Sequence, residues 1–250
     1  MSGTIANLYR HPIKGFTPER LEAATLTAGA YFPCDRIYAV EDGPSGFDPD
    51  HPAFISKSKF TVLAKLPRVA CARTIYDDAS SQITISAPKV ESLTADLTED
   101  DGRKALANWL ARFLGEDVRG PLKVLPCAPD HRFTDDPTGH VSIISLASVR
   151  DLEARLGVPI DPLRFRANIY VEGWPAWWEM DQKGQALRFG EALLEVTKPI
   201  IRCAATHVDP GTGLRDLDLV KALFDAYGHQ YCGVYAKIVQ GGTIAIGDAC

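Results

Sequence analysis

Short stretches of alternating or β-branched apolar residues run through most of the chain and predict strands. In the first third, predicted strands cover residues 4–9, 21–27, 35–41, 68–76 and 81–87. Later predicted strands cover residues 141–145, 167–173, 186–198, 232–239 and 242–248. Strands therefore dominate the expected structure.

Three segments instead carry apolar residues at helical spacing, and they predict helices over residues 98–115, 145–157 and 216–228. Strands in sequence with a few inserted helices lack the regular alternation of a doubly wound sheet. The pattern therefore predicts an α+β, mainly β protein centred on a β-barrel. We place a division after the first helix, giving one unit over residues 1–118 and a second over residues 119–250.

Composition narrows the class of protein. The 250-residue chain is 46% hydrophobic and has a formal net charge of -5, which argues against nonspecific nucleic-acid binding. The first residues, "MSGTIANLYRHPIKGF", lack the apolar core of a signal peptide, and no apolar run approaches a membrane span. No two of the six cysteines form a Cys-x-x-Cys pair. We therefore expect a cytoplasmic protein with reduced thiols.

The stretch "IIRCAATHVDPGTGLRD" offers the first candidate chemistry. Arg202 beside Cys203 favours the thiolate, which is both a nucleophile and a soft metal ligand. Pro199 cannot donate to a ladder, so the preceding strand should end or lie at an edge there. Asp209 begins a strong turn and can accept hydrogen bonds from its amides. A buried, inert Cys203 is the alternative.

Cationic side chains form a second candidate site. Lys14 lies on a constrained turn between proline and glycine, and Arg36 begins a strand. Arg164, Arg166 and Asn168 alternate at the entry of another predicted strand, which would put them on one face. This arrangement predicts an anion-binding site, since forked arginines grip phosphate well. A solvated edge with its own ion pairs is the alternative.

Two further sites are compatible with the residue types. Cys203, His207, His229 and Cys232 offer two sulfurs and two nitrogens to a zinc ion, although their order matches no common zinc pattern. A hydrolytic pair of Cys203 with His207, His229 or His140 is also open, because the sequence fixes none of their distances.

Several motifs, in order and together covering nearly the whole chain, resemble one known family. "LYRHPIKGF" and "CDRIYAVED" resemble the N-terminal β-barrel domain that accompanies MOSC domains. "RFRANIYVEG", "ALRFGEALLEVTKPIIRCAATHVDPGTG" and "HQYCGVYAKIVQGGTIAIGD" resemble the MOSC domain itself. This family takes its name from the C-terminal domain of molybdenum cofactor sulfurase, and it includes the mitochondrial amidoxime-reducing component.

The resemblance implies a molybdenum cofactor, a molybdopterin with a metal-binding dithiolene and a terminal phosphate. It maps the metal ligand and a catalytic role onto Cys203, and a second role, in shaping the metal loop, onto Asp209. It also implies a set of cofactor contacts, namely Lys14, Arg36, Ser145, Arg166, Asn168 and Arg202.

The implied activity is an oxidoreductase that reduces N-hydroxylated substrates with electrons from a separate redox protein or reductase. The alternatives are a cofactor carrier, a sulfur-transfer protein with a persulfide on Cys203, and a relative that has lost cofactor binding. The family's labels also include pyridoxal phosphate binding. Three positions depart from many relatives: Gly15 replaces serine, Ile200 replaces cysteine and Gln182 replaces tryptophan.

Overall fold

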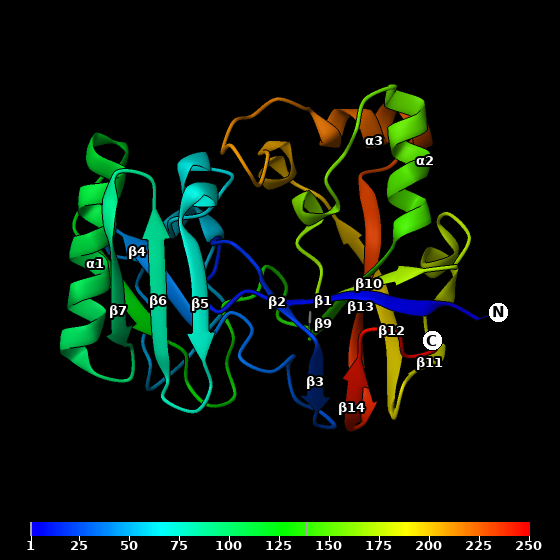
Figure 1. Cartoon of the computed structure of the whole chain (residues 1–250), viewed down its shortest axis with the longest axis horizontal. Coiled ribbons are helices and arrows are strands. Elements are labelled where there is room, and N and C mark those ends of the chain that lie inside the picture. The colour runs from blue at the N-terminus through cyan, green and yellow to red at the C-terminus, as the bar shows by residue number, and fades with distance from the viewer. Residues whose placement is uncertain (1, 139) are drawn as a thin grey trace.

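A computed structural model of the chain describes residues 2–138 and 140–250 (Figure 1). Its strands are β1 (Thr4–Arg10), β2 (Glu19–Leu21), β3 (Ala23–Leu26), β4 (Tyr38–Asp42), β5 (Arg73–Asp77), β6 (Gln82–Ala87), β7 (Val90–Asp96), β8 (Leu122–Pro126), β9 (Val141–Ser145), β10 (Ile169–Glu172), β11 (Ala186–Phe189), β12 (Ala192–Ile201), β13 (Tyr231–Gln240) and β14 (Gly242–Ala245). Its α-helices are α1 (Asp100–Leu114), α2 (Leu146–Leu156) and α3 (Leu219–Tyr227). Short 3₁₀ turns include Lys57–Lys59, Pro67–Cys71, Pro162–Phe165, Trp178–Gln182 and Ala204–His207.

One large sheet organises the second half of the chain. Its seven strands follow the order β11-β12-β13-β9-β10-β1-β2, and β14 pairs separately with β3. Helices α2 and α3 lie together at one end of this sheet (Figure 1). We call this part, residues 2–32 together with 140–250, the large-sheet body.

The remaining strands form a smaller unit beside it, seen on the left of Figure 1. The order β5-β6-β7 makes a three-stranded sheet, β4 pairs with β8, and α1 packs on β7 and β8. The α1 face that carries Leu106, Trp109, Leu110 and Phe113 is buried in this core, as helical spacing requires. We call this part, residues 34–127, the small-sheet body.

The first strands of the chain belong to the large-sheet body and not to their sequence neighbours. β1 pairs antiparallel with β10, and β3 pairs antiparallel with β14. Ile5 and Leu8 are fully buried in the same apolar cluster as β9 and β13. The division between residues 118 and 119 therefore does not coincide with the boundary between the two apolar cores, because the first strands pack in the core of the second half.

The predicted class, a mainly β α+β protein with a few inserted helices, is confirmed. Among the described residues the large sheet is open, with β11 and β2 at its edges, so no ladder closes into a barrel. β9 matches its prediction residue for residue, and all three helices are present. No predicted strand covers β7 or β8, and residues 68–71, the first part of the predicted strand over residues 68–76, belong to a 3₁₀ turn. No described helix has the length and apolarity needed to cross a membrane.

We predict that a fragment over residues 119–250 will not fold cooperatively. It would lack β1 and β3, and so would expose the backbone edge of β10 and the apolar face that Ile5 and Leu8 cover. Urea unfolding followed by circular dichroism would measure this.

The control is the same fragment with residues 2–30 fused to its C-terminus through a short flexible linker. Gly3 N donates to Cys250 O at 2.6 Å, so the fused strands can return to their native places. A cooperative transition for the unfused fragment would contradict the prediction.

Candidate functional site

A cavity of about 360 Å³ lies between the two bodies. Cationic side chains predominate among its charged lining residues, which are Arg36, Lys57, Arg164, Arg166, Lys198, Arg202, Asp135 and Asp136. A smaller pocket of about 50 Å³ adjoins it, shares Arg36, Lys57, Asp135 and Arg166, and adds Lys14. The predicted anion-binding residues are thus brought together from both halves of the chain.

Cys203 lies in the cavity wall, directly after β12 ends. Its side chain is half-buried, so the thiol is neither sealed in the core nor fully solvated. Only the first part of β12 pairs with β11, so Pro199 lies where the strand has one neighbour, as its missing N–H requires. Lys57 stands beside the thiol: burial opposes its charge, but Asp135 and Cys203 raise the pKa of Lys57.

Arg202 lines the cavity beside Cys203, and its hydrogen bonds go to backbone carbonyls. Its side chain is buried, and it donates from Nε to Cys232 O at 2.8 Å and from Nη1 to Phe165 O at 2.7 Å. Gly233, with φ +71°, leaves room for this, because a Cβ there would lie 3.2 Å from Arg202 Nη2. Arg202 therefore fixes the backbone around Cys203 and adds positive charge, while its hydrogen bonds go to protein carbonyls.

Arg36 and Arg166 face the cavity from backbone positions that side chains rarely adopt. Their φ angles are +52° and +54°, in the left-handed region. Such positions cost about 1 to 3 kcal/mol each and cluster at functional sites. Arg166 Nη1 donates to Phe16 O at 2.6 Å, while its Nη2 is buried without a hydrogen-bond partner among the described residues. Burial and the nearby Arg36 lower the pKa of Arg166 to about 10.

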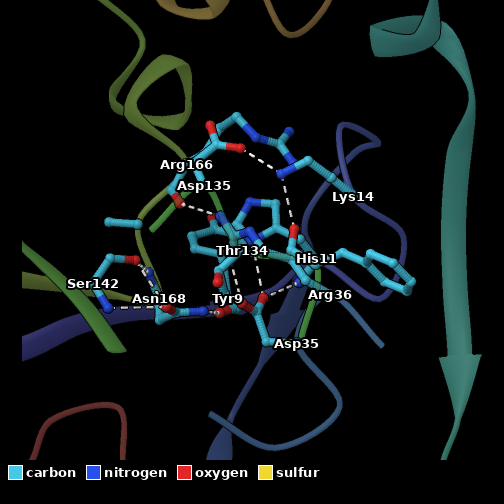
Figure 2. Close-up of polar contacts among 12 residues, drawn as sticks. Tyr9, His11, Lys14, Asp35, Arg36, Thr134, Asp135, Ser142, Arg166 and Asn168 are labelled. Atoms are coloured by element: carbon cyan, nitrogen blue, oxygen red, sulfur yellow. Dashed lines mark hydrogen bonds and ion pairs between the residues drawn. The ribbon is translucent and has the colours of Figure 1, made fainter. Parts of the chain in front are cut away.

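Lys14 reaches the same region from the N-terminal turn (Figure 2). Its Nζ donates to Phe133 O at 2.9 Å and pairs with Asp135, which also lies 3.6 Å from Lys57 Nζ. Burial lowers the pKa of Lys14, and Asp135 offsets part of that effect. Burial alone would raise the pKa of Asp135, but Lys14 and Lys57 hold it well below its usual range. Asp135 is thus the internal counter-ion of the two lysines.

A buried histidine, His11, and a buried carboxylate, Asp35, form a polar cluster with Arg36 (Figure 2). His11 N donates to Asp35 Oδ1 at 2.7 Å, His11 Nδ1 lies 3.3 Å from the same atom, and Asp35 also pairs with Arg36. Burial and the charges of Arg166 and Arg36 lower the pKa of His11 to about 3. His11 is therefore neutral at physiological pH.

Asn168 joins three strands at the cavity floor. Its Oδ1 accepts from Ser142 N at 3.0 Å and Ser142 Oγ at 2.8 Å, and its Nδ2 donates to Tyr9 O at 3.1 Å. Asn168 lines the cavity together with Arg164 and Arg166, but strand alternation does not bring them there. Residues 162–165 form a 3₁₀ turn and Arg166 ends it, so a turn, not an alternating strand, aims Arg164 and Arg166 at the cavity.

Ser145 is not part of the cavity. It is fully buried, its N donates to Glu179 Oε1 at 3.2 Å, and its Oγ lies 3.4 Å from Trp174 O. Ser148 Oγ donates to the same Glu179 carboxylate at 2.9 Å. The N-terminus of α2 is therefore already occupied by the carboxyl group of Glu179, which corrects the expectation that Ser145 contacts the cofactor.

Asp209 also lies outside the cavity lining. Its Oδ1 accepts from Gly211 N at 3.0 Å and Thr212 N at 2.7 Å, as the turn pattern predicts. Its Oδ2 accepts from Arg164 Nη2 at 3.1 Å. Asp209 thus reaches the cavity only through Arg164.

The zinc alternative is contradicted. The described residues contain no cluster of three or more His, Cys, Asp or Glu side chains that could hold a metal ion. Cys232 is fully buried in an apolar cluster, His229 stacks on Tyr227, and His207 Nε2 lies 3.1 Å from Asp218. None of the described cavity-lining residues is a histidine, so these residues also offer no histidine base for a hydrolytic Cys203.

Comparison with family models decides the relationship. Residues 2–117 match the MOSC N-terminal beta barrel domain, and residues 130–250 match the MOSC domain. The chain belongs to the MOSC family.

Curated relatives of this MOSC protein share low identity with it. A molybdenum cofactor sulfurase from Caenorhabditis briggsae is 24% identical over 94% of the chain, and human mitochondrial amidoxime-reducing component 1 is 27% identical over 60% of it. The chain covers 33% of the sulfurase and 52% of the human protein, so it spans about half or less of these relatives. Among solved structures, the YUAD protein from Bacillus subtilis matches with a TM-score of 0.48 at 14% identity, over 100% of this chain and 94% of that one.

No sequence pattern marks several residues of the site. Lys57 lies in a short 3₁₀ turn and Asp135 in an irregular stretch, where no periodicity identifies them. One signal points to Asp35. It directly precedes Arg36, and a buried cation needs a counter-ion nearby.

The departures at two positions of this MOSC protein have structural explanations. Gly15 has φ +86°, and a Cβ there would lie 2.6 Å from Thr61 O, so this backbone accepts only glycine. Ile200 is buried and lines the cavity as an apolar wall.

We predict that Gly15→Ser destabilises the protein by about 1 to 3 kcal/mol and does not strengthen anion binding, because the side chain collides with Thr61 before it can face the cavity. Urea unfolding and phosphate titration would measure the two effects. Gly29→Ser, at φ +75° with nothing near the added Cβ, separates backbone strain from the collision. Equal stability of both variants would contradict the collision.

We also predict that the buried, neutral His11 makes stability fall with decreasing pH. The unfolded chain binds a proton near pH 6.5, but the folded chain does not until about pH 3, so acid favours unfolding throughout that window. Each pH unit below 6.5 then costs up to about 1.4 kcal/mol. Wild type should lose roughly 2 to 3 kcal/mol between pH 6.5 and 4.5.

His11→Asn is the matched variant, since it keeps an N–H for Asp35 but does not titrate. Its free energy of unfolding should change less over the same pH range, measured by urea titration at each pH. Identical slopes for the two proteins would contradict the assignment.

Proposed function

We propose that this MOSC protein binds the molybdenum cofactor in the cavity, with the Cys203 thiolate as a ligand to molybdenum. The observation that carries this proposal is a half-buried thiol in the wall of a cavity whose charged residues are mostly cations. A thiolate is a soft ligand suited to such a metal, and a cationic wall suits a phosphate.

The residues present fit this group. Arg166 Nη2 is a buried donor with no partner among the described residues, and Lys14 and Lys57 share the single carboxylate of Asp135. An anion in this region would satisfy charges that the protein itself only partly balances. The volume of about 360 Å³ is in the ordinary range for a small-molecule site.

Each residue then has a role. Lys14, Arg36, Lys57 and Arg166 would hold the phosphate and pterin, while Arg202 and Asn168 fix the walls around them. Asp209 would act on the metal loop through Arg164, and Ser145 takes no part. When bound, the cofactor supplies a metal that changes oxidation state, which no side chain here can do.

The activity we infer is reduction of N-hydroxylated substrates. The N–O bond breaks, two electrons and two protons are consumed, and an N–H product and water are released. The electrons come from a separate redox protein or reductase. Support comes from the amidoxime-reducing relatives of human and mouse, which share 27% and 33% identity over the matched parts.

A second candidate is a cofactor carrier or a sulfur-transfer protein, with Cys203 holding a persulfide. Its support is the sulfurase relative, whose match spans 94% of this chain, against 60% for the human amidoxime-reducing component. The same half-buried thiol would serve either function. The cytoplasmic location and the pyridoxal phosphate label stay predictions.

The test is molybdenum and pterin content after purification from a host that makes the cofactor, together with reduction of a model amidoxime by a dye-reduced enzyme. Wild type should hold the metal tightly, and Cys203→Ala should lose at least tenfold in turnover while keeping its fold. Absence of pterin from wild type, or full turnover by Cys203→Ala, would sink the proposal.

Cys127→Ala is the matched control. Cys127 is also half-buried beside an arginine, with Arg132 Nη1 donating to its sulfur at 3.3 Å, but it lies outside the cavity lining. It should keep wild-type metal content and turnover. Labile cofactor together with a trapped persulfide on Cys203 would instead favour the carrier.

A further inference from the structure

The segment that follows Cys203 leaves the large-sheet body and crosses to the small-sheet body. We call residues 204–216 the clasp. Figure 1 shows this stretch, in orange, reaching from the region of α3 toward the elements next to β5. It begins with the Ala204–His207 turn and continues through the Asp-Pro-Gly-Thr-Gly turn.

The clasp is docked on the small-sheet body by apolar and polar contacts. Val208 is buried in that body's apolar core, and Ala205 packs against the same cluster. Arg215 Nη2 donates to Ala64 O at 2.9 Å, and Cys71 Sγ donates to Thr212 O at 3.4 Å. Side-chain and backbone contacts along the clasp therefore cross the boundary between the bodies.

Gly213 makes this docking close. Its φ is +71°, and a Cβ there would lie 3.0 Å from Cys71 Sγ and 3.2 Å from Pro67 O. Any side chain would push the turn away from residues 67–71.

The other side of the clasp is tied to the large-sheet body by one buried arginine. Arg164 donates to His207 O at 3.0 Å, to Asp209 at 3.1 Å and to Asp216 at 2.8 Å. Asp209 in turn organises the turn amides. Arg164 thus ties the start and the end of the clasp to the large-sheet body, while residues between them contact the small-sheet body.

Cys203 immediately precedes the clasp. Thr206 N and Thr206 Oγ1 both donate to Cys203 O at 3.0 Å, so the first turn of the clasp sets the backbone of the cysteine. On the preceding side, Arg202 is tied to carbonyls of the large-sheet body. The position of the thiol therefore depends on how the clasp docks.

We propose that docking of the clasp positions the Cys203 thiol in the cavity, and that Arg215 and Gly213 are positioning residues for it. Releasing the contacts of Thr212, Gly213 and Arg215 would let this part of the clasp move away from the small-sheet body, and the thiol would become more exposed. The importance of that thiol as a metal ligand rests on the proposed function, but its placement by the clasp does not.

The experiment measures alkylation by iodoacetamide, residue by residue with mass spectrometry, in the full chain free of cofactor. Arg215→Ala and Gly213→Ala should each raise the rate at Cys203 at least threefold and leave the rates at Cys34 and Cys250 within a factor of two. Arg215→Lys should restore part of the protection, because an ammonium can still donate to Ala64 O. Arg112→Ala, an exposed arginine of α1, should change nothing.

An unchanged rate at Cys203 in both variants would overturn the proposal, and so would equal acceleration at all cysteines, which would signal general loosening. If Arg215→Ala does not fold, Gly213→Ala and Arg215→Lys carry the test. Failure of the wild type to bind molybdenum would refute the proposed function alone, because the alkylation rates are measured without it.

Discussion

The antiparallel pairing of β1 with β10 is the constraint on which the site depends. Because the strands run in opposite directions, the end of β1 lies beside the start of β10, with Leu8 opposite Ile169. The residues that follow β1, among them Lys14, therefore meet those that precede β10, among them Arg166, although about 150 positions separate them in the sequence. Hydrogen bonds between Asn168 and Tyr9 stabilise this arrangement.

Placing several cations close together is energetically unfavourable, and only a few carboxylates of the protein compensate their charge. Asp35 pairs with Arg36, and Asp135 lies between Lys14 and Lys57, while Arg166 keeps an unpartnered nitrogen among the described residues. Removing charge from water is unfavourable unless partners compensate. Because this compensation is partial, an anionic ligand gains the most interaction energy beside those cations that the protein's own carboxylates do not pair.

Strand and helix content follows from periodicity. Cys203, Asn168 and four arginines of the cavity follow from residue type and family resemblance. What could not be read was set by long-range contacts. Ser145 looked like a free helix N-terminus because nothing local shows that Glu179, from a distant turn, occupies it. Arg164 and Arg166 do not lie on an alternating strand, since Arg166 ends a turn in the left-handed region. Lys57 lies in a short 3₁₀ turn that no local pattern places beside the cavity.

The structure explains two of the positions at which this chain differs from many relatives. Gly15 and Ile200 suggested a chain that had lost contacts to a cofactor. At Gly15 the backbone passes so close to Thr61 that no side chain fits, and Ile200 forms an apolar part of the wall. Neither change removes a cation. The charged lining of the cavity depends on strand pairing. The clasp that fixes the thiol depends on Arg164 and Arg215. Neither feature therefore depends on the residues at positions 15 and 200.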